Sequence, residues 1–62
     1  LRSIETYNIT SSVTFFNISQ TAIMRRELAV GYRNNGIVEL NPAKFESIRF
    51  ADDGAIIVLA EE

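Results

Sequence analysis

The chain has 62 residues, of which 47% are hydrophobic, with a formal net charge of −2 and neither Cys nor His. A chain of this length forms one domain at most and buries only about 60% of the surface that its unfolded form exposes. The lack of Cys excludes disulfides, and the lack of both Cys and His argues against zinc or haem ligation. So small a domain must therefore be stabilised by efficient packing and by association with another chain.

Charge and hydropathy bear on location and partners. Six Lys and Arg residues spread along an acidic chain do not make the basic face that nucleic acids require, so we expect no nucleic-acid partner. No apolar run approaches the ~20 residues of a membrane span, and no signal peptide is recognisable. We expect residues 1–62 to form a single domain. Because the sequence starts at Leu1 rather than Met, we expect this domain to be part of a longer chain.

The first half of the chain predicts one strand and one helix. Residues 3–9 are rich in Ile, Thr and Tyr, which favours a strand. Residues 12–25 have helical periodicity, with Ser11 and Ser12 as candidate N-caps and two arginines at the end, where cations suit the helix dipole. At about 100° per residue, one broad face of this helix collects apolar side chains, namely Phe15, Phe16, Ile18, Ala22 and Ile23.

The next segment predicts a β-hairpin with residues 28–33 and 37–40 as strands. A two-residue loop at Asn35-Gly36 would set Tyr32 opposite Glu39. A three-residue loop pairs Tyr32 with Val38 instead and gathers the apolar side chains on one face, namely Leu28, Val30, Tyr32, Val38 and Leu40. We therefore predict the three-residue loop, with Gly36 in the left-handed region.

The last third predicts a turn and a final strand. Pro42 ends the hairpin, and residues 43–50 fit either a short helical turn or an extended segment. Residues 52–54, Asp-Asp-Gly, signal a turn. Residues 55–60 are apolar without alternation, so both faces of this strand need cover. One helix covers one face only, and the other needs a second helix or another chain.

Together these elements predict an α+β fold, a small antiparallel sheet of about four strands with one main helix packed on it. Five apolar side chains are candidates for contact with a partner. Ile56 and Val58 belong to the final strand, and Met24 falls off the main helical stripe. Phe15 and Phe16 could line a ligand pocket, although core packing is the favoured interpretation.

No pattern of catalytic residues stands out. Without His or Cys the usual general bases and thiol nucleophiles are missing, so we expect no enzyme activity, no metal site and no cofactor. Asp52 and Asp53 could be paired carboxylates or calcium ligands, but a turn before a strand is the favoured interpretation. An enzyme fragment completed by another chain would need a polar cluster facing the interface, and the sequence shows none.

A series of features gives the second half a distinctive pattern. A strand ending in Gly31-Tyr32-Arg33 is followed by an Asn-Asn-Gly turn, a second strand running to Asn41-Pro42, and an acidic turn before an Ile-Ile-Val-Leu-Ala strand. The pattern resembles the C-terminal subdomain of RCK regulators of potassium conductance, also called the TrkA-C domain. It is most similar to the cytosolic region of CASTOR/POLLUX-type ion channels, and extends from Thr14 to Glu61.

The resemblance implies a cytosolic module attached to the membrane pore domain of a potassium channel or transporter. It also implies a homodimer or larger ring, with small-molecule or ion ligands at subunit interfaces. Nucleotide binding in that family belongs to a preceding subdomain, so no nucleotide-binding residue is carried over. The family commonly has Gly-Asp where this chain has Asp53-Gly54, so no family role is assigned to Asp53.

The leading hypothesis is therefore a cytosolic regulatory or dimerisation domain of a cation channel or transporter. It would sense a small ligand or ion through linkage to the arrangement of its subunits. The alternative is a structural protein-interaction module that binds no ligand.

Overall fold

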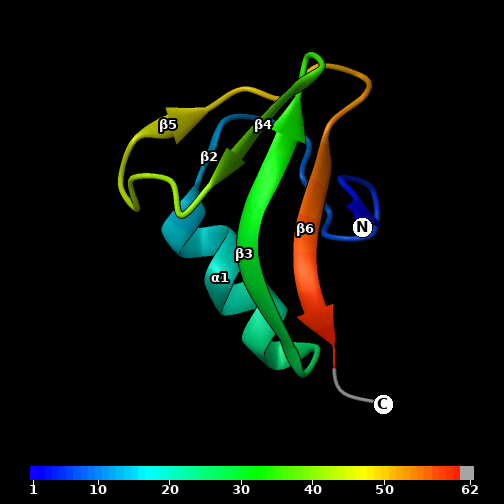
Figure 1. The fold of residues 1–62 in the computed structure, drawn as a ribbon, viewed down its shortest axis with the longest axis vertical. Coiled ribbons are helices and arrows are strands. Elements are labelled where there is room, and N and C mark those ends of the chain that lie inside the picture. Colours follow the sequence, from blue (N-terminus) through cyan, green and yellow to red (C-terminus); the bar gives the residue numbers. More distant parts are fainter. Residues whose placement is uncertain (61–62) are drawn as a thin grey trace.

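One helix lies across one face of a four-stranded antiparallel sheet, beside a small two-stranded sheet (Figure 1). The computed structural model describes residues 1–60, so Glu61, the last residue of the resemblance, lies outside the described part. The elements in chain order are β1 (Arg2–Ser3), β2 (Val13–Thr14), α1 (Phe15–Met24), β3 (Glu27–Asn34), β4 (Ile37–Leu40), β5 (Ser47–Ile48) and β6 (Ala55–Ala60). The larger sheet has the order β1-β6-β3-β4, and β2 pairs with β5. The predicted α+β fold is confirmed.

The helix begins later than the sequence predicts. Thr14 is its N-cap, because the Thr14 Oγ1 accepts the backbone N–H of Asn17 at 3.2 Å. The predicted caps, Ser11 and Ser12, are wrong, since the pairing of β2 with β5 keeps residues 13 and 14 extended. At the other end, Arg26 adopts a left-handed conformation with φ 58°, which turns the chain from α1 into β3.

The buried stripe of α1 is narrower than predicted. Phe15, Ile18 and Ala22 are buried against the sheet, as expected for positions about one and two turns apart. Phe16 and Ile23 are exposed at the margins of the stripe. Phe16 stacks there on the exposed ring of Phe45, with the two centroids 5.4 Å apart.

The predicted strand over residues 3–9 is wrong for most of its length. Only Arg2 and Ser3 pair with β6, and the chain then turns, with the N–H of Tyr7 donating to the carbonyl of Ile4 at 3.2 Å. Burial of the Tyr7 side chain in the core explains the turn, because a continuing edge strand would carry that ring away from the helix. The composition of residues 3–9 does not show that the chain turns inward after Ser3.

The hairpin has a two-residue loop, so the predicted three-residue loop is wrong. Tyr32 lies opposite Glu39, and Asn34 lies opposite Ile37. Asn35 and Gly36 both have positive φ, 54° and 78°, as the tightest hairpin turns require. The prediction failed because it assumed one apolar face. The observed register instead puts Tyr32 under the helix and leaves Val38 on the opposite side of the sheet.

Polar side chains fasten this turn to the chain that follows β5. The carboxylate of Asp53 accepts the N–H groups of Asn35 and Gly36, each at 2.8 Å. The Asn34 side chain donates to the carbonyl of Arg49 at 3.0 Å and accepts the N–H of Ala51 at 2.8 Å. The tip of the hairpin and residues 49–53 therefore hold each other in place.

Residues 43–50, for which the sequence left two alternatives open, include the short extended strand β5. Ile48 of β5 is buried in the core. Phe50 just beyond it stands edge-on to Tyr32, with ring centroids 5.4 Å apart. Tyr32 also lies 6.5 Å from the ring of Phe15, so aromatic contacts join the helix, the hairpin and this segment.

Gly31 marks the closest approach of β3 and β4. A β-bulge lies between Ala29 and Gly31 in the pairing of β3 with β6, so the strand deviates from regular geometry at this point. A Cβ atom on Gly31 would lie 2.2 Å from the backbone oxygen of Glu39, a distance that no side chain can occupy. The backbone of β4 must therefore move if residue 31 carries any side chain.

We predict that Gly31→Ala destabilises the chain by about 2 kcal/mol, because the added methyl group forces the two backbones apart. Urea unfolding followed by far-UV circular dichroism measures the loss. Gly36→Ala is the matched control, since a Cβ there meets open space and only the positive φ is penalised, by about 1 kcal/mol. A Gly31 variant that is no less stable than the Gly36 variant would contradict the close approach.

Candidate functional site

The two faces of the larger sheet have different surroundings, although both are apolar. Along β6, Ile56 is 0% exposed beneath α1, and Val58 packs against the same core. Side chains alternate along a strand, so Ile57 and Leu59 point to the opposite face. Leu28 is paired with Leu59 and lies on that face beside it. No described element of the chain covers this second face (Figure 1).

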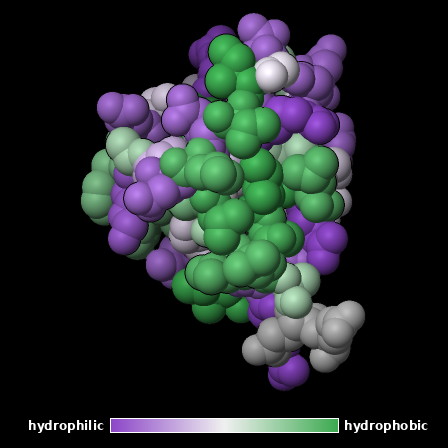
Figure 2. All heavy atoms as spheres, in the orientation of Figure 1, coloured by the Kyte–Doolittle hydropathy of each residue, from purple (hydrophilic) through white to green (hydrophobic). Residues whose placement is uncertain are grey.

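The uncovered face carries a continuous group of aliphatic side chains, which we call the open-face patch: Leu28, Val38, Leu40, Ile57 and Leu59. Four of them are 55–64% exposed, and Ile57 is partly buried. Figure 2 shows hydrophobic residues running down the middle of this face, with polar residues on either side. An exposed aliphatic patch with a polar rim is typical of an interaction surface.

Gly31 lies beneath the patch, and Arg33 lies at one end of it. Gly31 is buried in the middle of the sheet, with the side chain of Leu40 close above it. The absence of a side chain at this position lets Leu40 lie low against β3. Arg33 shares the same face at the end of β3, where its guanidinium donates to the backbone oxygen of Asp53 at 3.4 Å. The patch is thus uncharged along its length and meets a cation at one end.

The structure distributes the five sequence-predicted contact residues over three environments. Ile56 and Phe15 are in the core, and Val58 is partly buried against it, so none of them offers an open surface. Phe16 and Met24 are exposed on α1, and Met24 reaches 86% exposure. The β6 side chains on the uncovered face are Ile57, which is partly buried, and Leu59, which is exposed. The lack of alternation in residues 55–60 signalled that both faces are apolar, but not which residues face α1.

A buried carboxylate, Glu27, lies where the first strand, the helix end and β3 meet. It accepts a hydrogen bond from the Tyr7 hydroxyl at 2.5 Å and one from the Arg2 Nε at 2.6 Å. The Nε of Arg25 donates at 3.2 Å to Oε1, the oxygen that also accepts the Tyr7 hydroxyl, and the Arg25 guanidinium stands 5.4 Å from the centre of the Tyr7 ring. Glu27 therefore connects the N-terminal segment, which holds Arg2 and Tyr7, to the end of α1 and the start of β3.

The surroundings of this cluster shift two pKa values in opposite directions. The hydrogen bond from Tyr7, together with those from Arg2 and Arg25, lowers the pKa of Glu27 to about 2 despite its burial. Burial, and then the hydrogen bond to the Glu27 carboxylate, raises the pKa of Tyr7 to about 12. Both groups therefore keep one protonation state over the whole neutral range, which suits a structural role.

The acidic pair before β6 has a structural role at one of its two positions. Asp53 binds the hairpin turn, and the N–H groups of Asn35 and Gly36 lower the pKa of its carboxyl group. Asp52 is exposed beside it. Within residues 1–60, no three Asp, Glu, His or Cys side chains gather closely enough to hold a metal ion. The turn interpretation of Asp53 is confirmed by these contacts.

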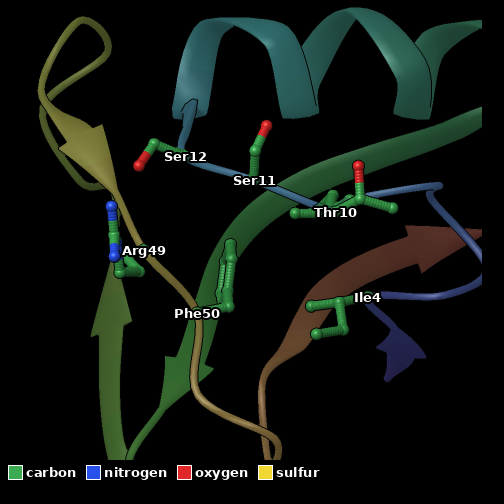
Figure 3. Close-up of a pocket in the computed structure, with 7 residues that line it drawn as sticks. Ile4, Thr10, Ser11, Ser12, Arg49 and Phe50 are labelled. Carbon is green, nitrogen blue, oxygen red and sulfur yellow. The ribbon is translucent and has the colours of Figure 1, made fainter.

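An open hollow of about 550 Å³ lies between residues 9–12 and residues 49–50 (Figure 3). Ile4 and Phe50 supply apolar walls. The hydroxyl groups of Ser11 and Ser12 point in different directions, and Arg49 lies at the end away from Ile4. Because these polar groups do not converge, the hollow does not select one ligand chemistry.

Comparison of the chain with family models, curated proteins and solved structures finds no match. The resemblance to RCK-type C-terminal domains is therefore a resemblance of residue pattern alone. Over the described residues, the structure holds no helix with the length and apolar character needed to cross a membrane.

We predict that acid and alkali both weaken the fold through the Glu27 cluster. The pKa of Glu27 falls on folding from 4.5 to about 2, so its contribution is complete above about pH 4.5 and is lost as the pH falls towards 2. The pKa of Tyr7 rises from 10.0 to about 12, so its contribution is complete below pH 10 and is lost as the pH rises through 12. Urea unfolding at a series of pH values measures both limbs.

Two variants test which residue causes the loss of stability in acid and which causes the loss in alkali. Glu27→Gln should lower the stability at neutral pH and reduce the acid dependence, leaving the part that Asp53 contributes. Tyr7→Phe should reduce the alkaline limb and leave the part that Tyr32 contributes, because burial raises the pKa of Tyr32 as well. Glu5→Gln, at an exposed carboxyl outside the cluster, serves as the control. An acid limb of unchanged size in Glu27→Gln would show that Glu27 does not carry it.

Proposed function

We propose that this chain is a cytosolic regulatory domain of a potassium or other cation channel or transporter, and that it works by association through the open-face patch. The observation that carries the proposal is the uncovered aliphatic face of β3, β4 and β6. The likeness of residues 14–61 to RCK-type C-terminal domains supplies the channel or transporter context.

The size of the patch supports a role in association. Full burial of a Leu side chain contributes about 1.5–3 kcal/mol, and the patch residues keep roughly half of their surface exposed. Covering the patch therefore offers on the order of 5 kcal/mol from each surface brought together. Two such surfaces offer on the order of 10 kcal/mol, which is similar in size to an association cost of about 4–15 kcal/mol, so the net affinity is modest at most. A modest affinity is what a reversible switch requires.

The proposed mechanism is linkage between association and the pore. If two arrangements of the assembled domains bury the patch differently, a ligand or ion that binds one of them better shifts the population towards it. Typical coupling energies of about 1–3 kcal/mol correspond to roughly 5- to 150-fold changes in affinity.

We predict that Leu28→Ser combined with Leu59→Ser, in the full-length protein that carries this segment, changes potassium flux at least about fivefold, the lower end of typical coupling. Both positions face away from the core, so the fold should persist. Potassium efflux from liposomes containing the purified protein measures the effect. Met24→Ser, at an even more exposed apolar position on α1, is the control and should leave the flux unchanged.

Flux that is the same in the double variant and in the wild type would count against the regulatory proposal. Calorimetry with ATP, Mg²⁺ and Ca²⁺ as separate probes then distinguishes the two kinds of module. Heat of binding to the full-length protein that disappears in the double variant supports ligand sensing. If the double variant changes the flux but none of the three probes gives a heat of binding, the result supports a docking module that has no ligand.

A further inference from the structure

We propose that Asn35 is a site of spontaneous deamidation, and that the Asp53 carboxylate keeps the reaction slow by holding the hairpin turn closed. Deamidation places a new carboxylate at the tip of the hairpin. The inference goes beyond the proposed function, because it concerns the chemistry of the turn itself and requires no partner chain.

The reaction joins two groups that are neighbours in the chain. The backbone nitrogen of Gly36 loses its proton and attacks the side-chain carbonyl carbon of Asn35, so that a C–N bond forms and a cyclic imide results. The amide NH2 group of Asn35 leaves as ammonia with the proton that Gly36 lost. Water then opens the imide at either of its carbonyl carbons and leaves aspartate or isoaspartate at position 35. Water enters and ammonia leaves, so no oxidant or cofactor is needed.

Asn35 is the asparagine of this chain that best suits the reaction. The chain has five Asn residues, and only Asn35 precedes a glycine, whereas the other four precede Asn, Pro or the β-branched Ile. Gly36 brings no side chain to crowd its own nitrogen, and no distant residue lies within 4 Å of where a Cβ would stand. Both residues are exposed, so water and hydroxide reach them.

The geometry of the folded turn opposes ring closure. The φ angles of 54° at Asn35 and 78° at Gly36 are those of a type I′ turn, in which ψ of the first central residue is about +30°. At that ψ the nitrogen of Gly36 and the Cβ of Asn35 lie on nearly opposite sides of the Cα–C bond. Ring closure needs them on the same side, so the turn must open before the reaction proceeds.

Asp53 holds the turn by the atoms that the reaction needs. Its Oδ1 accepts the N–H of Asn35 and its Oδ2 accepts the N–H of Gly36, each at 2.8 Å. These two hydrogen bonds lower the pKa of the Asp53 carboxyl group, which keeps it ionised at neutral pH. Loss of the Gly36 proton puts negative charge directly against this carboxylate. Asp53 therefore opposes both the opening of the turn and the ionisation of the attacking nitrogen.

Deamidation changes contacts beyond the turn. Both products carry a carboxylate beside Asp53, and isoaspartate also lengthens the loop by a backbone atom, which the two-residue turn does not accommodate. The tip of the hairpin, which lies against the segment leading into β6 (Figure 1), is then held there less firmly. β4 follows the turn directly and carries Val38 and Leu40 of the open-face patch. Deamidation therefore loosens the strand at one edge of the patch.

Peptide mapping by mass spectrometry during incubation at mildly alkaline pH tests the inference, because replacement of NH2 by OH raises the mass of the peptide. Asp53→Ala should increase the rate at Asn35 in the folded chain at least about tenfold, which corresponds to about 1.4 kcal/mol in the opening of the turn. Asp52→Ala, at the exposed carboxyl next in sequence, is the matched control and should leave the rate unchanged.

A second variant and a second condition complete the test. Asp53→Asn keeps the shape of the side chain and removes its charge, so it should act in the same direction and replaces Asp53→Ala if far-UV circular dichroism shows that variant to be unfolded. In denaturing urea the turn is absent. There Asn35 should react faster than the other Asn residues, at one rate in the wild type and in the Asp53 variants.

Each part of the inference has a result that overturns it. If Asn35 is no faster than the other Asn residues in urea, it is not the site. If the folded wild type reacts as fast as the folded Asp53 variants, Asp53 does not protect it, and slower variants would make Asp53 a base instead. The deamidated chain, separated by anion exchange, should unfold at a lower urea concentration than the unreacted chain. An unchanged midpoint would overturn the link between Asn35 and the hold on the hairpin tip.

Discussion

β3 and β6 lie in the middle of the larger sheet, and the rest of the chain is held against one or both of them. Their pairing extends from Glu27 opposite Ala60 to Arg33 opposite Ala55. α1 packs on one face of the pair, β1 and β4 extend it on either side, and the aromatic rings of Phe15 and Phe50 meet on Tyr32. A change that separates these two strands would remove the support of each of these contacts.

Carboxylates secure β3 at both ends. At its start, Glu27 is held by Arg2, Tyr7 and Arg25, which brings the N-terminal segment and the helix end to one point. At its far end, Asp53 accepts both N–H groups of the hairpin turn. In a domain with no disulfide, these charge-assisted hydrogen bonds do what cross-links do in other small domains: they fix distant parts of the chain relative to one another.

The elements with the strongest local signals were predictable, and those set by distant contacts were not. The apolar run of residues 55–60 and the Asn-Gly turn identified β6 and the β3–β4 hairpin, and the periodicity of residues 12–25 identified α1. The hairpin register was wrong because one apolar face was assumed, although Asn-Gly is itself a local signal for a two-residue turn. The contact of Asp53 with this turn, from 17 residues beyond Gly36, has no local signal. Likewise, the turn over residues 4–8 depends on where the Tyr7 side chain is buried.

The open-face patch was predicted in part: Leu28, Val38 and Leu40 belong to the predicted apolar face of the hairpin, but the members from β6 were wrong. The final strand showed that two faces needed cover, yet the assignment of Ile56 and Val58 to the outer one was a choice that alternation alone leaves undetermined. Because Ile56 is buried under α1, the β6 side chains on the uncovered face lie one position further along, at Ile57 and Leu59. A shift of one position along a strand moves every side chain to the opposite face, so an error of one residue misassigns the whole strand.

Glu39 has a consequence for how copies of this sheet can be arranged. It places a charge in the middle of β4, the short edge strand whose backbone is otherwise free to pair with another sheet. Charged residues on short edge strands discourage the addition of further strands. An assembly that grew by edge pairing would have no natural end, whereas one that grows by burying a single face is complete after one step. The chain thus combines an apolar face that favours contact with an edge strand that disfavours the addition of further strands. This combination favours small closed assemblies over fibres.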